Sequence, residues 1–400
     1  MNFMALKSIS KVNVKNKTLL LRVDLNSNVV KGKIQLAERI RAHAKTIKFL
    51  SKKGAKIVVL SHQGRKGESD FVSLQQHAKA LSRLVGKKIS FLDWNSDYLN
   101  AISSLKKGQI LLLGNTRFLE FETEEKSPEE HSKNPIIKQL ASKADYYVLD
   151  SLSVAHRSHA TVVGFIPLLS SFVGPVLEEE LLNLNKALSL EVHPKLLVLG
   201  GVKLSDSIGI ISFFLSKGKA DKVLAGGALG ELFLKASSYD LGGKEKFFRD
   251  NNLNALIPKA KEILSSFRPK ILMPSDIALD VLGSRKELSV HDLPSKYWCK
   301  DIGQKTIIEF SKEIKEAKLI VFNGPMGVFE EKNFFQGTKA VLQSIASSKA
   351  FSFLGGGDTI TAIEKLKLNK KKYSYISLSG KASLDFLSGK ELPALKVLQS

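Results

Sequence analysis

The sequence predicts an α/β protein with two doubly wound, parallel-sheet domains of the Rossmann-like type, joined by a hinge helix. Short apolar runs without polar alternation recur along the chain, each separated by enough residues for a helix. This pattern is typical of parallel strands that are covered on both faces. The chain has 400 residues, more than one ordinary core holds, so two domains are expected.

Ten apolar runs are expected as strands. Those in the first half are residues 19–23, 56–60, 110–113 and 146–149. Those in the second half are residues 196–199, 222–225, 271–273, 319–322, 351–354 and 375–378. Ligands of such sheets bind beyond the carboxyl ends of the strands, so the residues that follow each run are the candidate site.

A helix is expected between the two series of strands. Gly174 and Pro175 precede apolar residues at positions 177, 181, 184 and 188, which share one helical face. We therefore expect a first domain over residues 1–172, a hinge helix over 173–190 and a second domain over 191–385.

The net charge of +22 is high and is concentrated in the first half of the chain. A basic excess indicates an anionic partner, which includes nucleic acid, a membrane surface or a phosphorylated metabolite. The chain has no zinc-finger spacing, arginine-rich arm or aromatic ribonucleoprotein motif, which argues against nucleic acid. Many lysines, such as the run at 370–372, are more simply explained as solvated surface.

Cysteine content and hydropathy indicate the cellular compartment in which the protein is expected. The single cysteine, Cys299, excludes an intramolecular disulfide and fits a reducing environment. No apolar run reaches the roughly 18 residues of a membrane span. Residues 1–18 lack the apolar centre of a signal peptide. A cytoplasmic protein without a membrane segment is expected.

Glycine clusters follow several strands of the second half. Gly200 and Gly201 precede Lys203 and Asp206, and further clusters lie at 226–227, 323–330, 355–359 and 379–383. Glycines let backbone N–H groups approach an anion, and a lysine can follow a moving phosphoryl group. Tight-turn geometry alone would explain two of these glycine clusters, but not four. The set predicts a nucleotide site without a Walker A sequence, with Asp358 available to hold Mg²⁺.

Arginines and histidines follow the strands of the first half, and Asp24 and Asn26 among them are available to hydrogen-bond hydroxyl groups. The residues concerned are Asp24, Asn26, Arg39, His62, Arg65, Arg117, His156 and Arg157. Guanidinium groups suit bidentate capture of carboxylate and phosphate, so a small phosphorylated acid is the expected ligand. Any one arginine is also explained as a salt-bridge partner, and His62 and His156 as histidines satisfied at strand ends.

At this point the chain resembles the phosphoglycerate kinase family over nearly its whole length, and its archaeal branch in particular. The motifs that carry the resemblance are residues 22–26, 61–65, 155–157, 200–203, 323–330 and 355–359. The resemblance implies that 3-phosphoglycerate is held by Asp24, Asn26, Arg39, His62, Arg65, Arg117 and Arg157. It implies a nucleotide site of Gly201, Lys203, Gly226, Gly227, Asn323, Pro325, Glu330, Gly355, Gly356, Gly357, Asp358 and Thr359.

The resemblance also implies the reaction. Arg39, Lys203 and Gly380 would be catalytic and Asp358 would bind Mg²⁺, in reversible in-line transfer between 1,3-bisphosphoglycerate and MgADP that gives 3-phosphoglycerate and MgATP. The two domains would close about the hinge helix. The implied protein is a monomer whose tail, from about 386 to 400, packs on the first domain.

The chain departs from the family pattern at several positions. Ser207 stands where the family usually has a second lysine, and Ser379-Gly380-Lys381 replaces three glycines. Lys381 either replaces part of the missing positive charge or points to solvent. Gly114 stands in place of a glutamate, and residues 149–152 differ from the usual Asn-Asp-Ala-Phe.

Two other functions remain open at this point. One is a divergent homologue with weak or lost catalysis that binds an anion, RNA or a protein through its basic surface. The other is a kinase for a different small phosphorylated carboxylate. The two complete sets of site residues favour the active phosphoglycerate kinase, because a binding module needs only one of them.

Overall fold

Two six-stranded parallel sheets form the framework of the part of the chain that this computed structural model describes, residues 6–189 and 191–399. The chain divides into a first unit, Met1–Leu182 with Glu391–Ser400, and a second unit, Asn183–Lys390. The predicted domain, hinge and tail segments also include residues 1–5, 190 and 400, which lie outside the described residues. The predicted fold class, two parallel-sheet α/β domains, is confirmed.

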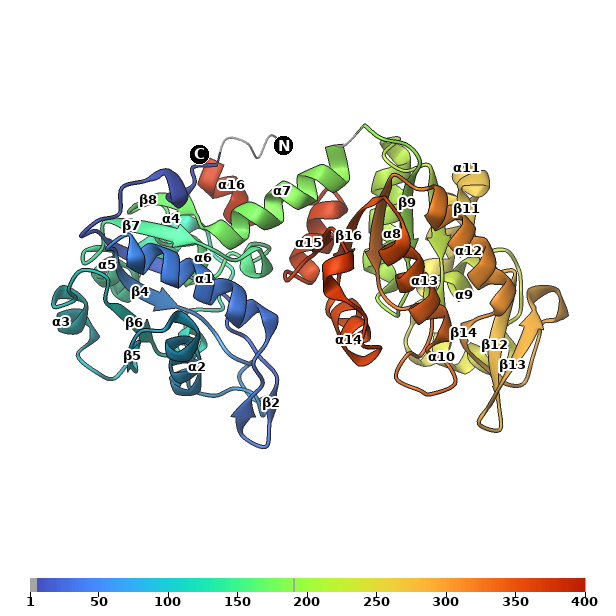
Figure 1. Cartoon of the computed structure of the whole chain (residues 1–400), viewed down its shortest axis with the longest axis horizontal. Coiled ribbons are helices and arrows are strands. Elements are labelled where there is room, and N and C mark those ends of the chain that lie inside the picture. The colour runs from blue at the N-terminus through green and yellow to red at the C-terminus, as the bar shows by residue number, and fades with distance from the viewer. Residues whose placement is uncertain (1–5, 190, 400) are drawn as a thin grey trace. The chain divides into compact units, whose positions relative to one another are not determined.

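The sheet of the first unit has the strand order β5-β6-β4-β1-β7-β8 (Figure 1). Its strands are β1 (Thr18–Arg22), β4 (Lys56–Leu60), β5 (Ser90–Leu92), β6 (Ile110–Leu113), β7 (Tyr146–Leu149) and β8 (Ser170–Val173). All five residues of β1 are buried, which explains why its sequence shows no polar alternation. The edge strands β5 and β8 are partly exposed and were not predicted.

Helices connect these strands and cover the sheet. They are α1 (Glu38–Lys52), α2 (Gln75–Val85), α3 (Tyr98–Ser103), α4 (Pro128–Ser132), α5 (Pro135–Ala141), α6 (Ala160–Val163) and the C-terminal α16 (Pro393–Gln399). Ile40 and Ile47 of α1 belong to the same buried cluster as Leu19 and Leu21 of β1. The apolar stripe of α1 thereby fixes the helix against one face of the sheet.

The helix α7 (Pro175–Ser189) carries the boundary between the two units. Leu177 and Leu184 on its predicted apolar face are fully buried. At its start, Asp150 Oδ1 accepts a 2.8 Å hydrogen bond from the backbone N–H of Val176. A carboxylate at this end satisfies a free helix donor and opposes the positive helix end.

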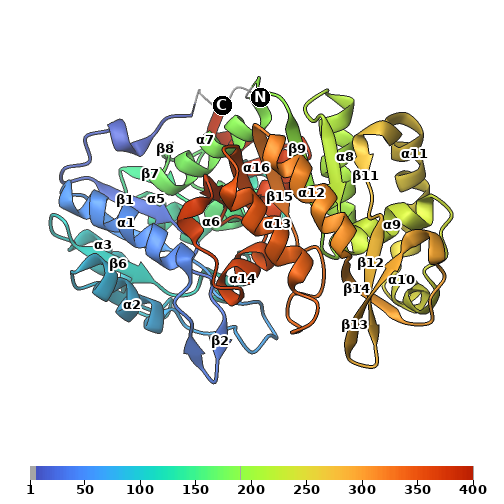
Figure 2. The same cartoon turned by 45° about the vertical axis from the view of Figure 1, so that its right-hand side comes forward.

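The sheet of the second unit has the strand order β11-β10-β9-β15-β16-β17 (Figure 2). Its strands are β9 (Lys195–Leu199), β10 (Lys222–Ala225), β11 (Ile271–Leu272), β15 (Leu319–Asn323), β16 (Phe351–Gly355) and β17 (Tyr375–Ile376). The helices are α8 (Leu204–Ser216), α9 (Gly227–Ala236), α10 (Glu245–Asp250), α11 (Ile257–Phe267), α12 (Gln304–Glu316), α13 (Gln336–Ser347), α14 (Gly357–Lys365) and α15 (Lys381–Leu387). Apolar residues of α12, α13 and α14 share one buried cluster with β9 and β15, so these helices cover one face of the sheet.

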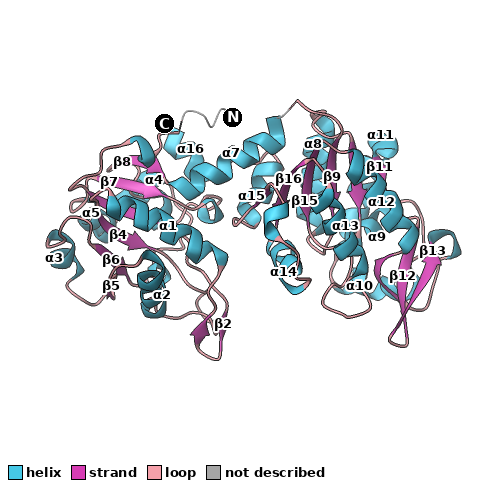
Figure 3. Ribbon diagram, in the orientation of Figure 1, coloured by secondary structure: helices cyan, strands magenta, loops and turns pink. Residues whose placement is uncertain are grey.

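Two antiparallel additions were not predicted (Figure 3). The first unit carries the hairpin β2 (Val29–Val30) and β3 (Lys33–Ile34). The second carries a three-stranded sheet of β12 (Asp276–Val281), β13 (Ser284–Ser289) and β14 (Trp298–Ile302), in the order β13-β12-β14. Within the described residues, no helix is both long and apolar enough to cross a membrane.

Each parallel sheet has a point where the direction of strand addition reverses. In the first unit it lies between β1 and β7, and in the second between β9 and β15. Loops diverge at such a point and leave room for a ligand beyond the carboxyl ends of the strands. Asp24 follows β1 and Gly200 follows β9, so the candidate residues lie where both sheets accept ligands.

Candidate functional site

A basic cavity of about 620 Å³ lies in the first unit. Its charged and polar lining is Arg65, Lys66, Arg117, Glu120, Thr123, Arg157 and His159, and its apolar lining is Phe71, Phe118 and Leu119. Three of the predicted arginines therefore meet in one hollow, which suits an anion larger than a single phosphate. Asp24, Asn26, Arg39 and His62, which were predicted with them, do not line this cavity.

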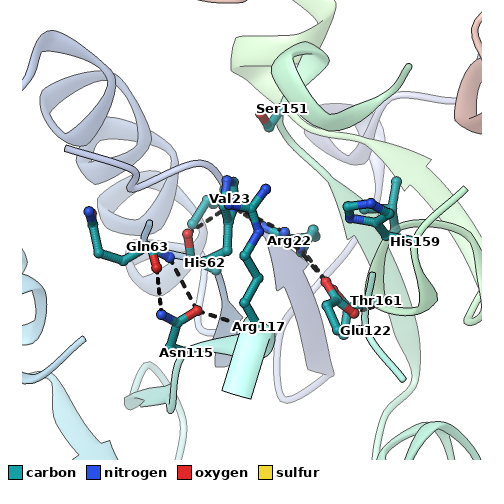
Figure 4. Close-up of polar contacts among 12 residues, drawn as sticks. Arg22, Val23, His62, Gln63, Asn115, Arg117, Glu122, Ser151, His159 and Thr161 are labelled. Atoms are coloured by element: carbon teal, nitrogen blue, oxygen red, sulfur yellow. Dashed lines mark hydrogen bonds and ion pairs between the residues drawn. The ribbon is translucent and has the colours of Figure 1, made fainter. Parts of the chain in front are cut away.

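Arg22 is buried, and its guanidinium group contacts several neighbouring polar groups (Figure 4). Its Nε donates to Thr161 Oγ1 at 3.0 Å and its Nη1 to the carbonyl of Val23 at 2.5 Å. Its Nη2 lies 3.8 Å from Glu122 Oε1, and Glu122 is itself fully buried. The guanidinium therefore supports the site from within and is not exposed to a ligand.

His62 is buried against Arg22. The Nη2 group of Arg22 lies 3.2 Å from His62 Nδ1, and since a guanidinium can only donate, the ring accepts through Nδ1. Burial, together with the charges of Arg22 and Arg117, lowers the pKa of His62 well below its usual value, although Asp24 opposes this. His62 is therefore neutral, with its proton on Nε2, and offers a donor to a ligand oxygen.

Asp24 is buried and ionised. Its Oδ2 lies 2.5 Å from Arg39 Nη1 and accepts a hydrogen bond of 2.5 Å from Ser153 Oγ. Its Oδ1 accepts from the backbone N–H of Asn26 at 2.9 Å. Burial alone would raise the pKa of Asp24, but the charge of Arg39 and the donors Ser153 and Asn26 hold it well below its usual value. The carboxylate thus fixes the Arg39 guanidinium at the end of β1.

The arginines of the basic cavity repel one another. Burial and the neighbouring Arg157, Arg22 and Arg65 lower the pKa of Arg117 to about 10, although Glu122 opposes this. Burial and Arg65 also lower the pKa of Arg157. Arg117 Nη1 donates to the carbonyl of Gly64, which holds the guanidinium in place. A bound anion would reduce the electrostatic repulsion among these positive groups.

Several buried polar residues position these loops and were not predicted. Gln63 Oε1 accepts from the backbone N–H of Ser27 at 2.8 Å, and Asn115 Nδ2 donates to the carbonyl of Gln63 at 2.7 Å. The predicted residue Asn26, which is half-buried, also takes part: its Oδ1 accepts from the backbone N–H of Gly64 at 2.8 Å. These contacts join segments that lie dozens of residues apart, so the sequence does not show them. Only the position of Gln63 and Asn115 shortly after a strand could have indicated these residues.

The smaller cavity of the second unit has a volume of about 110 Å³. It is lined by Gly200, Gly201, Val202, Lys203, Asp206, Asn323, Gly324, Gly356, Gly357, Asp358, Thr359, Gly380, Lys381 and Leu384. Its walls are thus mainly the glycine turns after β9, β15 and β16, with the first residues of α8 and α14. Backbone N–H groups at helix starts favour a phosphate, and a side chain would block its approach.

The glycine turns also pack directly against one another. A Cβ atom on Gly200 would lie 2.2 Å from the carbonyl oxygen of Pro325, and one on Gly227 would lie 2.8 Å from the same oxygen. Gly356 has a φ of +88° and would place a Cβ 2.5 Å from Asn323 Oδ1. The predicted residues Gly226 and Gly355 are buried and line neither this cavity nor the larger one of the second unit described below. They contribute to the packing of the turns.

Lys203 and Asp358 face each other at this cavity. Lys203 Nζ lies 3.6 Å from Asp358 Oδ2, and both side chains are more than half exposed. Thr359 is buried beneath them, where its Oγ1 accepts a 3.2 Å hydrogen bond from the N–H of Gly324. The described residues contain no group of three or more His, Cys, Asp or Glu side chains that could hold a metal ion. Asp206 and Asp358 are the two carboxylates that line this cavity, and Asp358 is the more exposed of them.

A second, larger cavity of about 760 Å³ adjoins the small one and shares Gly201, Val202 and Asp358 with it. The predicted nucleotide residues Gly227, Pro325 and Glu330 line it. Its far walls come from the unpredicted antiparallel sheet, including Ile277 and Trp298. A small glycine-walled cavity thus adjoins a larger one whose surface is mainly apolar, an arrangement that would suit a nucleotide.

Two departures from the family pattern have a structural explanation. A Cβ on Gly114 would lie 2.4 Å from Asp93 Oδ1 and 2.9 Å from Trp94, so a side chain there would require both of these side chains to shift. Ser207 is fully buried in α8 and does not line the 110 Å³ cavity, and its hydroxyl has no hydrogen-bond partner within the described part of the chain.

Comparison with known proteins agrees with this geometry. Residues 9–390 match the family model described as phosphoglycerate kinase. The chain is 38% identical to phosphoglycerate kinase 1 of Methanosarcina acetivorans, across 97% of this chain and 94% of that protein. It is 39% identical to the phosphoglycerate kinase of Thermococcus kodakarensis, across 98% and 96%.

Solved structures show the same likeness. The crystal structure of phosphoglycerate kinase from Pyrococcus horikoshii superposes with a TM-score of 0.91 at 37% identity, covering 98% of both chains. The enzyme from Coxiella burnetii superposes with a TM-score of 0.84 at 32% identity, again covering 98% of both. The chain belongs to the phosphoglycerate kinase family, whose members are phosphotransferases that use a carboxyl group as acceptor.

Proposed function

We propose that the first unit binds 3-phosphoglycerate or 1,3-bisphosphoglycerate and the second binds ADP or ATP, with the phosphoryl group passing directly between them. The observation that carries this assignment is that the two units have cavities of different chemical character. One unit offers a hollow with three arginines, and the other a glycine-walled cavity that opens into an apolar one. A phosphorylated acid fits the first, and a nucleotide fits the second.

In the first unit, Arg65, Arg117 and Arg157 hold the phosphate of the substrate through charge-assisted hydrogen bonds. Asp24, Asn26 and the Nε2–H of His62 orient its hydroxyl and carboxyl oxygens. Arg39, held by Asp24, neutralises the charge that develops on the acyl phosphate. These roles rest on the positions of the side chains at the ends of β1, β4 and β6 and after β7.

In the second unit, the turns that contain Gly201 and Gly357 direct N–H groups toward the nucleotide phosphates, and Glu330 bonds the ribose. Mg²⁺ would fit this site as an ion brought by the nucleotide, because Asp358 is an exposed carboxylate at the cavity and phosphate and water would supply the other oxygens. When bound, Mg²⁺ neutralises phosphate charge. Lys203 contacts the transferring phosphoryl group, and Gly380 leaves backbone space beside it.

Transfer requires no covalent intermediate with the enzyme, since phosphoryl transfer depends mainly on positioning and on charge neutralisation. The two half-sites lie on different units, so they must approach each other and exclude water. We assign the hinge to α7, in which the boundary between the units falls. One chain carries both half-sites, which supports a monomer, and the single buried cysteine supports the cytoplasm.

The test is the initial rate of MgATP-dependent phosphorylation of 3-phosphoglycerate, with the product removed by a coupled reductase. Lys203→Ala is expected to lower kcat by about a hundredfold to a thousandfold. Lys217→Ala, at the other end of α8, is the matched control and should leave the rate unchanged. A folded wild-type protein with no rate above that of Lys203→Ala would contradict the proposal. Activity only with another phosphorylated carboxylate would correct the substrate.

A further inference from the structure

Two lysines line the 110 Å³ phosphate cavity. Lys203 comes from the turn before α8, and Lys381 is the first residue of α15. We propose that Lys381 is a second catalytic lysine, which contacts the terminal phosphate of the nucleotide alongside Lys203. This inference rests on the proposed function, and it gives a role to a residue that replaces a glycine of the family pattern.

The charges that line this cavity balance only when Lys381 is counted. The charged lining residues are Lys203, Asp206, Asp358 and Lys381, two of each sign. Without Lys381 the lining would carry a net negative charge toward a polyphosphate that is itself strongly negative, which disfavours binding. The ammonium of Lys381 therefore removes an electrostatic barrier that Asp206 would otherwise impose on the nucleotide.

The position of the Lys381 ammonium allows it to reach a phosphate. Its Nζ lies 3.3 Å from Asp206 Oδ1 and 3.5 Å from Asp385 Oδ1, and its side chain is 55% exposed. Asp385 has a shorter contact of 2.8 Å with Lys390, so its charge is already paired. An ammonium has three protons, and these long contacts leave it able to donate to a ligand.

Lys381 also stays charged. Partial burial lowers its pKa, but Asp206 and Asp385 outweigh this effect and raise the pKa above its usual value. The ammonium is therefore protonated throughout the pH range in which a kinase assay is run.

The packing of α8 and α15 explains why the second lysine comes from α15. Ser207 of α8 is fully buried and does not line the cavity, so that position presents no group to it. Close by, a Cβ on Gly209 would lie 3.5 Å from Cβ of Ser388, at ordinary contact distance between the segments. Small residues on α8 thus allow the α15 segment to lie close and bring Lys381 to the cavity.

The first test compares Lys381→Met with Lys390→Met. Both variants remove one lysine that contacts Asp385, but Lys390 does not line the cavity. Lys381→Met should lower kcat/KM for MgATP by about tenfold, the lower end for a charged hydrogen bond because the site is half exposed. Lys390→Met should leave it unchanged. Equal kcat/KM values for the two variants would overturn the proposal.

A chemical test separates charge from structure. The only cysteine of the chain, Cys299, is buried, and burial raises the pKa of its thiol well above the usual value, so it resists alkylation. Lys381→Cys can therefore be alkylated selectively with bromoethylamine, which restores an ammonium, or with iodoacetamide, which adds a neutral group. The proposal requires recovery of kcat/KM with the first reagent alone. The same rate after both reagents, in protein with the wild-type unfolding midpoint, would overturn it.

Nucleotide affinity provides a readout that does not depend on turnover. Lys381→Met should weaken binding of ATP more than binding of ADP, because only ATP places a phosphate at the transfer position. Equal weakening of both would count against the contact. If the wild-type protein binds both nucleotides but phosphorylates no 3-phosphoglycerate, the proposed function fails while this comparison still decides the role of Lys381.

Discussion

Asp24 Oδ2 lies 2.5 Å from Arg39 Nη1 and 2.5 Å from Ser153 Oγ, so one buried carboxylate oxygen joins the end of β1 to α1 and to the loop after β7. These two contacts favour the ionised carboxylate of Asp24 over the protonated acid, and its pKa is therefore low. The pairing also fixes the guanidinium that we assign to the acyl phosphate.

We predict that Asp24→Asn lowers the free energy of unfolding of the first unit by about 1.5–3 kcal/mol at neutral pH. Because the folded-state pKa is lowered, the stabilisation is fully present above about pH 4 and is lost as the pH falls further. Denaturant unfolding of both proteins from pH 3 to 7 measures this difference. Lys17→Met, which breaks the exposed pair with Asp145, should cost less than about 1 kcal/mol. Equal losses in the two variants would contradict the prediction.

We predict that His62 is neutral at pH 5.5, with the proton on Nε2. Nitrogen-15 chemical shifts of the imidazole ring distinguish the two tautomers and the charged form. Because the folded-state pKa of His62 is lowered, only the unfolded chain gains this proton below about pH 6.5, and stability falls there. His62→Asn should reduce that slope by up to about 1.4 kcal/mol per pH unit. His193→Asn, at an exposed histidine of the second unit, should leave the slope of the first unit unchanged.

We predict that Arg117→Met raises the KM for 3-phosphoglycerate by about tenfold to a hundredfold, since it removes a charged donor from the phosphate. The same variant should be destabilised little or not at all without substrate, because it relieves repulsion from Arg65 and Arg157. Thermal unfolding with and without 3-phosphoglycerate measures both effects. Arg41→Met, on the exposed side of α1, should change neither value. A large loss of stability without substrate would mean that Arg117 is mainly a structural residue.

We predict that Asp358→Asn increases the Mg²⁺ concentration needed for half-maximal activity by about tenfold to a hundredfold. An amide is a weaker ligand for Mg²⁺ than a carboxylate, whereas nucleotide contacts to the glycine turns are retained. Titration of Mg²⁺ at saturating ATP measures the change. Glu364→Gln, an exposed acid of the same helix α14 that pairs with Lys370, is the control and should not alter the requirement.

The fold was predicted where the strands are buried. All ten predicted strands occur, because a central strand such as β1 is covered on both faces and reads as a continuous apolar run. The edge strands β5 and β8 begin with exposed serines, and β12 to β14 mix charged with apolar residues. Their pairing depends on partners elsewhere in the chain, which no local pattern of the sequence shows.

The sequence indicated candidate residues that directly follow strands, but not the buried residues that support them. Arg117 and Lys203 follow strands, and position alone indicated them. The support that Glu122 and Thr161 give to Arg22, and that Ser153 gives to Asp24, joins positions 100 or more residues apart. Such contacts require the three-dimensional structure. Ser207, which stands where the family usually has a second lysine, is a buried residue of α8, and its burial was not evident from the sequence.

The end of the chain belongs to the first unit, where Ala394 and Leu395 are buried and the N–H of Ala394 donates to the carbonyl of Ala155 at 3.2 Å. A ribosome therefore finishes every residue of the second unit before it supplies the last piece of the first. The unit that is translated first therefore cannot complete its native packing until residues 393–399 have been made and can pack beside Ala155.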